Sequence, residues 1–321
     1  MNLETSRPNP DLAPAPDAQP SPAARAGFVP SWRRFKGLAI FATVLVLVFI
    51  RPLLALLAFV PHQELYSHIL LIPFISGFLI WMKRDEFVPE SQPNRLLALL
   101  SFAVGALVLI GYRVALGRHW TFEVPDYLAV MVLAFLCFLL GGAFVFVGIK
   151  YLKSITFPVA FLFFCIPFPQ GVRDGIETFF QHGSAEVAYW MLTISGMPVF
   201  RSDTHFKMPG FALRVAPECS GIHSSLILLI TSLLAAYLFL RTSWRRWLFV
   251  LSVIPLALLR NGFRVFSLGQ LGVHYDPLIL DTWFHHHGGI LFFLLSLVPL
   301  FLLLKYLIRS EAPKEKAMAV R

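Results

Sequence analysis

Charged residues are scarce in this chain of 321 residues, at 14%, whereas soluble domains usually contain about 25%. Hydrophobic residues make up 57% of the sequence, 32 residues are phenylalanine, and the mean hydropathy is +0.70. This composition excludes an ordinary soluble domain, a disordered chain, a collagen-like chain and a nucleic-acid-binding domain. It indicates an integral membrane protein with several helical spans, each of about 20 apolar residues.

Cysteine is also rare, with Cys137, Cys165 and Cys219 as the three examples. An odd number of cysteines without a CxxC pair argues against a disulfide framework or a zinc site. Cys137 and Cys165 lie inside apolar runs and are interpreted as packing residues. Cys219 differs because it lies in the polar stretch VAPECSGIHSS, directly before an apolar run, where a reactive thiol can meet water.

The N-terminal segment lacks the apolar stretch of a secretory signal peptide before Arg33, so we expect no cleavage there. Its proline-rich and alanine-rich composition predicts a disordered cytoplasmic tail over residues 1–35. A transmembrane domain over residues 36–309 and a basic cytoplasmic tail over residues 310–321 complete the predicted organisation.

Long apolar runs predict an all-α fold, a polytopic helical membrane protein with about eight transmembrane helices. The run at 154–168 is the shortest and ends in the proline-rich sequence IPFPQ. The eight runs cover approximately residues 38–60, 66–82, 96–116, 127–149, 154–168, 222–240, 247–263 and 288–308.

The distribution of basic residues predicts that both termini are cytoplasmic, because cytoplasmic loops of membrane proteins are enriched in lysine and arginine. The outer segments would hold 10 of the 18 acidic residues. The net charge of +9 then reflects topology in the cell inner (plasma) membrane rather than a polyanionic partner. Near the ends of the spans, 17 of the 27 basic residues are then on the cytoplasmic side: Arg25, Arg33, Arg34, Lys36, Lys83, Arg84, Arg95, Lys150, Lys153, Arg241, Arg245, Arg246, Lys305, Arg309, Lys314, Lys316 and Arg321.

The region 169–221 begins and ends on the outer side in this topology. Residues 176–197 are only partly apolar, and counting them as a span would reverse the charge asymmetry, so we predict an amphipathic helix on the outer face. The residues that follow alternate in polarity and contain Pro209-Gly210, which predicts a short extended hairpin with its turn at that pair.

Three polar clusters share one predicted position, the outer end of a span. A cysteine thiol becomes a nucleophile when a helix N-terminus, an arginine or a histidine lowers its pKa. A histidine can exchange the proton, and an arginine can stabilise an oxyanion. The clusters are Cys219 before the sixth run, Arg260, Asn261 and Arg264 at the end of the seventh, and His285, His286 and His287 before the eighth.

Structural interpretations compete with these chemical ones. Arg260 and Arg264 can extend toward lipid headgroups, although two like charges four residues apart on a helix repel and favour a polar partner. The three adjacent histidines suggest a metal site, but consecutive helical residues point in different directions, so we expect no metal or other cofactor. His223 lies four residues after Cys219 and competes with the histidine run for the role of base.

The segments PECSGIHS, LLRNGFRV and FHHHGGILFF occur in this order, each beside a predicted span. Together they resemble the three signature segments of the exosortase and archaeosortase family of membrane transpeptidases. The segment IPFPQ and the stretch from ISGMPVF to VAPECSG are also similar to that family, so the resemblance covers roughly residues 40–308.

This resemblance implies a membrane cysteine transpeptidase or protease. Its substrates would be exported proteins with a C-terminal sorting signal, made of a short motif, a transmembrane helix and a basic tail. The family nucleophile falls on Cys219, the arginine of an N-x-x-R pattern on Arg264, and the histidine of an H-x-x-x-G pattern on His285 with Gly289. The neighbouring histidines and His223 remain alternatives for the acid/base. The implied partners are these substrate proteins and the lipid bilayer, with no nucleic acid.

A second hypothesis belongs to a different class. The arginines and histidines can instead line a pathway for an anionic substrate in a transporter or an assembly factor for exopolysaccharide export. Such a protein has no need of Cys219, and that residue therefore distinguishes the two hypotheses.

Overall fold

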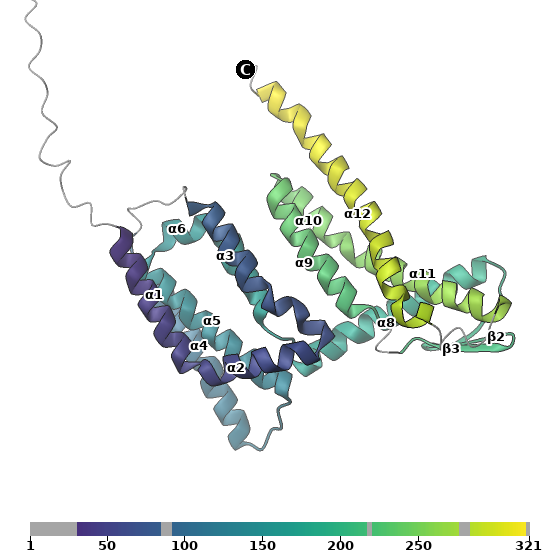
Figure 1. Ribbon diagram of the computed structural model, residues 1–321, viewed down its shortest axis with the longest axis horizontal. Coiled ribbons are helices and arrows are strands. Elements are labelled where there is room, and N and C mark those ends of the chain that lie inside the picture. The colour runs from purple at the N-terminus through teal and green to yellow at the C-terminus, as the bar shows by residue number, and fades with distance from the viewer. Residues whose placement is uncertain (1–30, 85–91, 217–219, 276–282, 319–321) are drawn as a thin grey trace, which may run out of the picture.

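The computed structural model describes residues 31–84, 92–216, 220–275 and 283–318 (Figure 1). The described chain is mostly helical with one small sheet, and the prediction of a polytopic helical membrane protein is confirmed. Its N-terminal elements are α1 (Ser31–Val48), α2 (Ile50–Phe59), η2 (Val60–His62), η3 (Glu64–Leu70), α3 (Ile72–Met82), α4 (Arg95–Gly117), α5 (Val124–Phe146), α6 (Ile149–Ser154), α7 (Thr156–Phe161) and η5 (Leu162–Cys165). The elements that follow are α8 (Gln170–Ile194), β1 (Phe200–Ser202), β2 (His205–Met208), β3 (Phe211–Arg214), α9 (Ile222–Phe239), α10 (Ser243–Leu251), α11 (Val253–His274) and α12 (Trp283–Met318).

The predicted number of eight spans is not reproduced. Among the described residues six helical segments are long and apolar enough to cross a membrane, or seven if one bent pair counts as a single span. The fifth predicted run, 154–168, is too short, because its apolar helix covers only Thr156–Cys165. The six segments are Glu64–Met82, Arg95–Gly117, Val124–Phe146, Ile222–Phe239, Ser243–His274 and Leu291–Glu311.

The bent pair corresponds to the first predicted run. Its two parts, Phe35–Val48 and Ile50–His62, meet at an angle of 71°. Pro52 has no backbone N–H to bond the carbonyl of Val48, so the helical hydrogen-bond ladder is interrupted at this point. The proline thus explains why a continuous apolar run does not form one straight helix.

The described chain begins with α1 and ends with α12. In Figure 1 the end of α12 is at the top, and α1 starts at the left and runs downward to α2. Helix α1 begins within the predicted tail 1–35, and α12 continues beyond residue 309 to Met318. The remaining parts of the two predicted tails, residues 1–30 and 319–321, lie outside the described residues.

Helix α8 is the amphipathic helix expected over 176–197, and it begins six residues earlier, at Gln170. It is not among the described helices that are long and apolar enough to cross a membrane. The three-stranded antiparallel sheet follows it in the order β1-β2-β3. The predicted turn at Pro209-Gly210 joins β2 to β3, with Gly210 at a φ of +70°. The hairpin prediction is confirmed, and β1 adds a third strand.

The sheet is attached to α8 by packing and by an ion pair. Phe206 and Leu213 are buried with Ala188 and Leu192 of α8 in one apolar cluster. Arg201 Nη1 donates to Glu186 Oε2 at 2.5 Å, and this hydrogen bond lowers the pKa of the Glu186 carboxyl from its ordinary value.

Small residues allow α8 and α11 to pack closely. A Cβ added to Gly262 of α11 would lie 2.5 Å from Val187 Cγ1, and one added to Gly183 of α8 would lie 2.7 Å from Leu258 Cδ2. Contacts of this kind let helix backbones approach each other where a larger side chain would separate them. The position of α11, which carries the predicted arginines, is therefore set by α8.

The N-terminal helices reach the same region through η3. Tyr66 and Ile69 of η3 are buried in one cluster with Phe161 of α7 and Leu226 of α9. The Tyr66 hydroxyl also donates to the carbonyl oxygen of Phe168 at 3.2 Å. These contacts place Glu64, at the start of η3, beside the first turn of α9.

Candidate active site

The start of α9 is a tight turn formed by Ser220 and Gly221. Helix α9 begins at Ile222, as the sequence predicts, and Gly221 precedes it with φ +76° and ψ +16°. Glycine adopts this left-handed conformation without the steric cost that a Cβ brings. Ser220 is fully buried. Cys219 itself lies outside the described residues, and it is joined directly to this turn.

Two consecutive residues of α11 hold this turn. Asn261 Nδ2 donates to the carbonyl oxygen of Ser220 at 3.2 Å. Arg260 Nη2 donates to the carbonyl oxygen of Gly221 at 3.3 Å. The first and second predicted polar clusters are therefore in direct contact, because the LLRNGFRV segment bonds the turn that follows Cys219.

Serine hydroxyls complete the hydrogen bonding around the turn. Ser225 Oγ donates to the Gly221 carbonyl oxygen at 2.7 Å, and Ser224 Oγ donates to the same oxygen at 3.1 Å. Ser225 Oγ also accepts a bond from Arg260 Nη2 at 3.4 Å. The two serines are not among the residues predicted from the sequence. Their spacing from Gly221, three and four residues into a helix, is the local signal that indicates such bonds.

Arg260 is buried, with 8% of its surface exposed. Its Nη1 atom has no hydrogen-bond partner among the described residues, while Nη2 binds the turn. Buried polar groups are normally hydrogen-bonded, and a buried guanidinium is especially costly to leave unsatisfied. The arginine therefore retains an N–H group for an additional acceptor beside the Ser220–Gly221 turn, such as a peptide carbonyl oxygen.

Arg264, the arginine chosen from the N-x-x-R pattern, lies one helical turn after Arg260 on α11 and is half-buried. Residues four apart share a helix face, so the two guanidinium groups bring two positive charges to one side of α11. Such a pair favours an anion or an oxyanion next to it.

His223, the alternative base, faces the N-terminal half of the chain. Its Nδ1 atom lies 3.9 Å from Glu64 Oε2, and its side chain is 35% exposed. The two side chains form an ion pair whenever the imidazole is protonated. The sequence gives no sign of this pairing, because the two residues, at 64 and 223, are 159 positions apart in the chain.

The histidine run lies at the start of α12. The helix begins at Trp283, so His285, His286 and His287 belong to its first turns, and Gly289 follows in the same helix. The side chains of these histidines are outside the described part of the structure. Among the residues that are described, no group of three or more histidine, cysteine or acidic side chains is close enough to hold a metal ion.

Fold and site together define a polytopic helical membrane protein in which a buried arginine and an asparagine clamp the turn that follows a cysteine. A family model described as transmembrane exosortase (Exosortase_EpsH) matches residues 60–302. The chain belongs to this family, which confirms the resemblance found in the sequence and suggests a membrane transpeptidase-type function. Searches of curated proteins and of solved structures give no match.

Proposed function

We propose that the protein is a membrane cysteine transpeptidase that cleaves the C-terminal sorting signal of exported proteins at the outer face of the inner membrane. The Cys219 thiolate attacks the scissile carbonyl carbon and forms a tetrahedral oxyanion. The C–N bond then breaks, His285 protonates the departing amine, and a thioester remains on Cys219. An acceptor amine or water then attacks the thioester carbonyl carbon. The C–S bond breaks, the product is released, the proton of the acceptor passes to His285, and Cys219 is again a thiolate.

The clamp formed by Arg260 and Asn261 on the Ser220–Gly221 turn carries this proposal. A nucleophile must be held in a fixed position for attack, and these bonds fix the residues that directly follow Cys219. The turn also opens α9, and the partial positive charge of a helix N-terminus favours a thiolate over a thiol.

Two arginines are candidates for stabilising the negative charge of the developing oxyanion. Arg264 is assigned by its position in the N-x-x-R pattern. Arg260 holds the turn through Nη2, and its Nη1 atom is without a partner among the described residues. Fixed donors aimed at the developing charge contribute the largest share of catalysis in many acyl-transfer enzymes. We assign the stabilisation of the oxyanion to Arg264 and the positioning of the turn to Arg260.

Cys219→Ala and Cys219→Ser should both abolish processing of a co-expressed protein that ends in a short motif, a transmembrane helix and a basic tail. The alanine variant has no nucleophile, and the serine hydroxyl is far less nucleophilic than a thiolate. The measurement is the size of the substrate by immunoblot, and Cys165→Ala, a change at a buried cysteine, is the control. Unchanged processing by Cys219→Ala would contradict the transpeptidase proposal and favour a transport or assembly role.

Among the histidines, His285→Ala should cause the dominant loss of processing. His223→Ala, and Glu64→Gln at its partner, should cause smaller and similar losses if the pair only adjusts the local charge beside the turn. The measurement is the initial rate of substrate cleavage for each variant, with His286→Ala and His287→Ala as neighbours for comparison. If His223→Ala alone abolishes cleavage, the assignment of the base to His285 is wrong.

A further inference from the structure

The connection from α5 to the short fifth apolar segment is broken twice. Gly148 adopts a φ of +86° between α5 and α6, and Ile155 interrupts the helix between α6 and α7. Helices α6 and α7 have six residues each, so this part of the chain does not form one straight helix packed along α5. The space that a straight helix would fill is left open toward α1 and α3.

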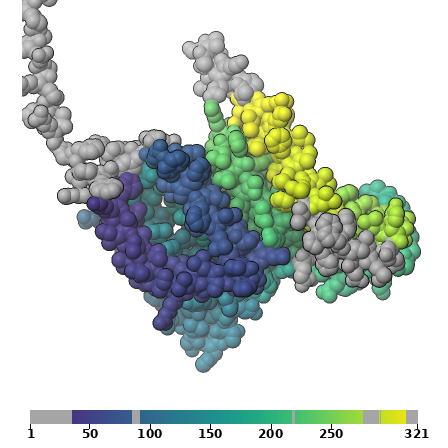
Figure 2. All heavy atoms as spheres, in the orientation of Figure 1, coloured from purple at the N-terminus to yellow at the C-terminus, as the bar shows by residue number. Residues whose placement is uncertain are grey.

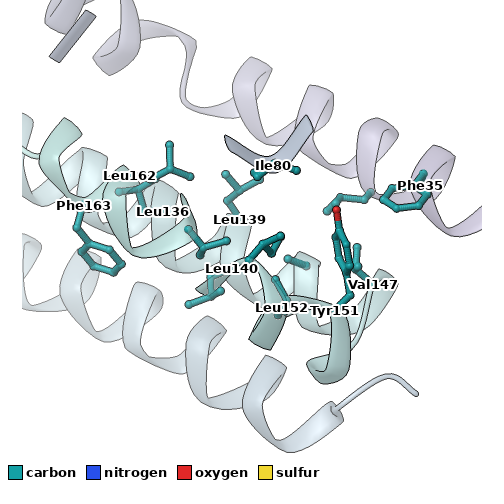
Figure 3. Close-up of a pocket in the computed structure, with 14 residues that line it drawn as sticks. Phe35, Ile80, Leu136, Leu139, Leu140, Val147, Tyr151, Leu152, Leu162 and Phe163 are labelled. Atoms are coloured by element: carbon teal, nitrogen blue, oxygen red, sulfur yellow. The ribbon is translucent and has the colours of Figure 1, made fainter. Parts of the chain in front are cut away.

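An apolar cavity of about 320 Å³ occupies this space. Figure 3 shows its wall, to which α5 contributes Leu136, Leu139 and Leu140 and the neighbouring elements contribute Phe35 and Ile80. Figure 2 shows a corresponding gap between the purple α1 and the blue α3. Tyr151 is the only lining residue with a polar side-chain atom among the described residues. The cavity therefore suits a hydrocarbon ligand rather than a polar substrate.

The length of the cavity matches one membrane leaflet. Its lining residues extend from Leu136 of α5 to Val147, directly after the end of this helix, which is about 17 Å at 1.5 Å per residue. The hydrocarbon core of a bilayer is about 30 Å thick, so the cavity covers about half of it. An acyl chain of one leaflet has this reach, whereas a transmembrane helix of a substrate protein would need a groove across the whole thickness.

Basic side chains surround the end of the cavity at Val147. Lys150 and Lys153 of α6 are exposed on either side of the cavity residues Tyr151 and Leu152, and exposed Lys36 follows the cavity residue Phe35. Lys83 lies at the same end, where its Nζ donates to the Ser154 carbonyl oxygen at 3.1 Å. Lysines at a membrane surface attract anionic headgroups.

We propose that this cavity binds one acyl chain of an anionic glycerophospholipid, with the headgroup phosphate next to Lys150 and Lys153. The apolar wall selects a hydrocarbon chain, the length selects a lipid of one leaflet, and the lysines select a negative headgroup. This lipid site is separate from the Ser220–Gly221 turn and does not depend on the proposed transpeptidase activity.

The proposal is tested with the full-length protein purified in a mild detergent. Native mass spectrometry should detect one retained phosphatidylglycerol per protein, and added phosphatidylglycerol should raise the Tm more than phosphatidylcholine with the same acyl chains. Ala143→Phe, which fills the cavity, should remove the retained lipid and the difference in Tm. Ala55→Phe at an exposed position outside the cavity is the control and should change neither.

A second pair of variants tests the headgroup. Lys150→Gln with Lys153→Gln should weaken binding of phosphatidylglycerol by about tenfold or more and leave binding of phosphatidylcholine unchanged. Lys305→Gln with Arg309→Gln removes two exposed charges from α12, away from the cavity, and should leave both unchanged. Equal stabilisation of the wild type by the two lipids, or full lipid retention by Ala143→Phe, would overturn the proposal. If Ala143→Phe does not fold, Leu139→Phe provides the same test of the cavity.

Discussion

Arg260→Met is expected to reduce substrate processing by about a hundredfold, because a displacement of about 1 Å of a positioned reacting group costs a reaction this much. Methionine keeps much of the buried volume but cannot donate to the Gly221 carbonyl oxygen or to Ser225 Oγ. The turn that follows Cys219 then loses the hydrogen bond that Arg260 donates to it. The measurement is the initial rate of cleavage of a co-expressed or reconstituted substrate.

Arg264→Met and Arg113→Met complete this experiment. Arg264→Met should cause a loss at least as large, because we assign the oxyanion to this residue. Arg113 is an exposed arginine within the α4 span, so Arg113→Met is a matched control that should retain full activity. Full activity of Arg260→Met would show that the contact between α11 and the turn does not support catalysis. If Arg260→Met is inactive while Arg264→Met is active, the N-x-x-R assignment is wrong and Arg260 takes its role.

Gly221→Ala should inactivate the protein and lower its stability. A residue with a Cβ is disfavoured in the left-handed conformation by about 1–2 kcal/mol. In addition, the new Cβ would lie 2.9 Å from Arg260 Nη2 and 3.2 Å from Asn261 Oδ1, so the side chains that clamp the turn must move. The strain and the displacement should act together on the residues beside Cys219.

Gly196→Ala separates these two effects. Gly196 has nearly the same backbone conformation, with φ +77°, but no atom lies within 4 Å of the position of its added Cβ. This variant should show a similar loss of stability from backbone strain and should keep its activity. Thermal unfolding in detergent and the rate of substrate cleavage are measured for both variants. Equal activity of the two would mean that crowding against Arg260 is unimportant.

Features that depend on neighbouring residues could be predicted from the sequence. The start of α9 at Ile222 follows from Ser220-Gly221, and the β2–β3 turn follows from Pro209-Gly210. Most spans follow from their apolar runs because hydrophobic length alone defines them. The bend before Ile50 had a local signal in Pro52, yet the apolar run over 38–60 was interpreted as a single span.

Features that depend on tertiary packing could not be predicted. The N-x-x-R pattern selects Arg264, but it does not show which arginine reaches the turn, because that depends on the rotation of α11. The approach of Glu64 to His223 requires that η3 pack against α9, and the cavity beside α5 requires the breaks at Gly148 and Ile155. Such contacts join residues far apart in the chain, and their partners leave no periodic signal in the sequence.

The seam of small residues between α8 and α11 has a consequence for the evolution of the site. Gly262 is two residues after Arg260, about 200° around the helix, so it lies on nearly the opposite side of α11. A larger residue at Gly262, or at Val187 against it, would push α11 toward the turn from behind without altering any residue of the clamp. Substitutions in α8 can thus displace the arginine and alter reactivity at a distance from the chemistry.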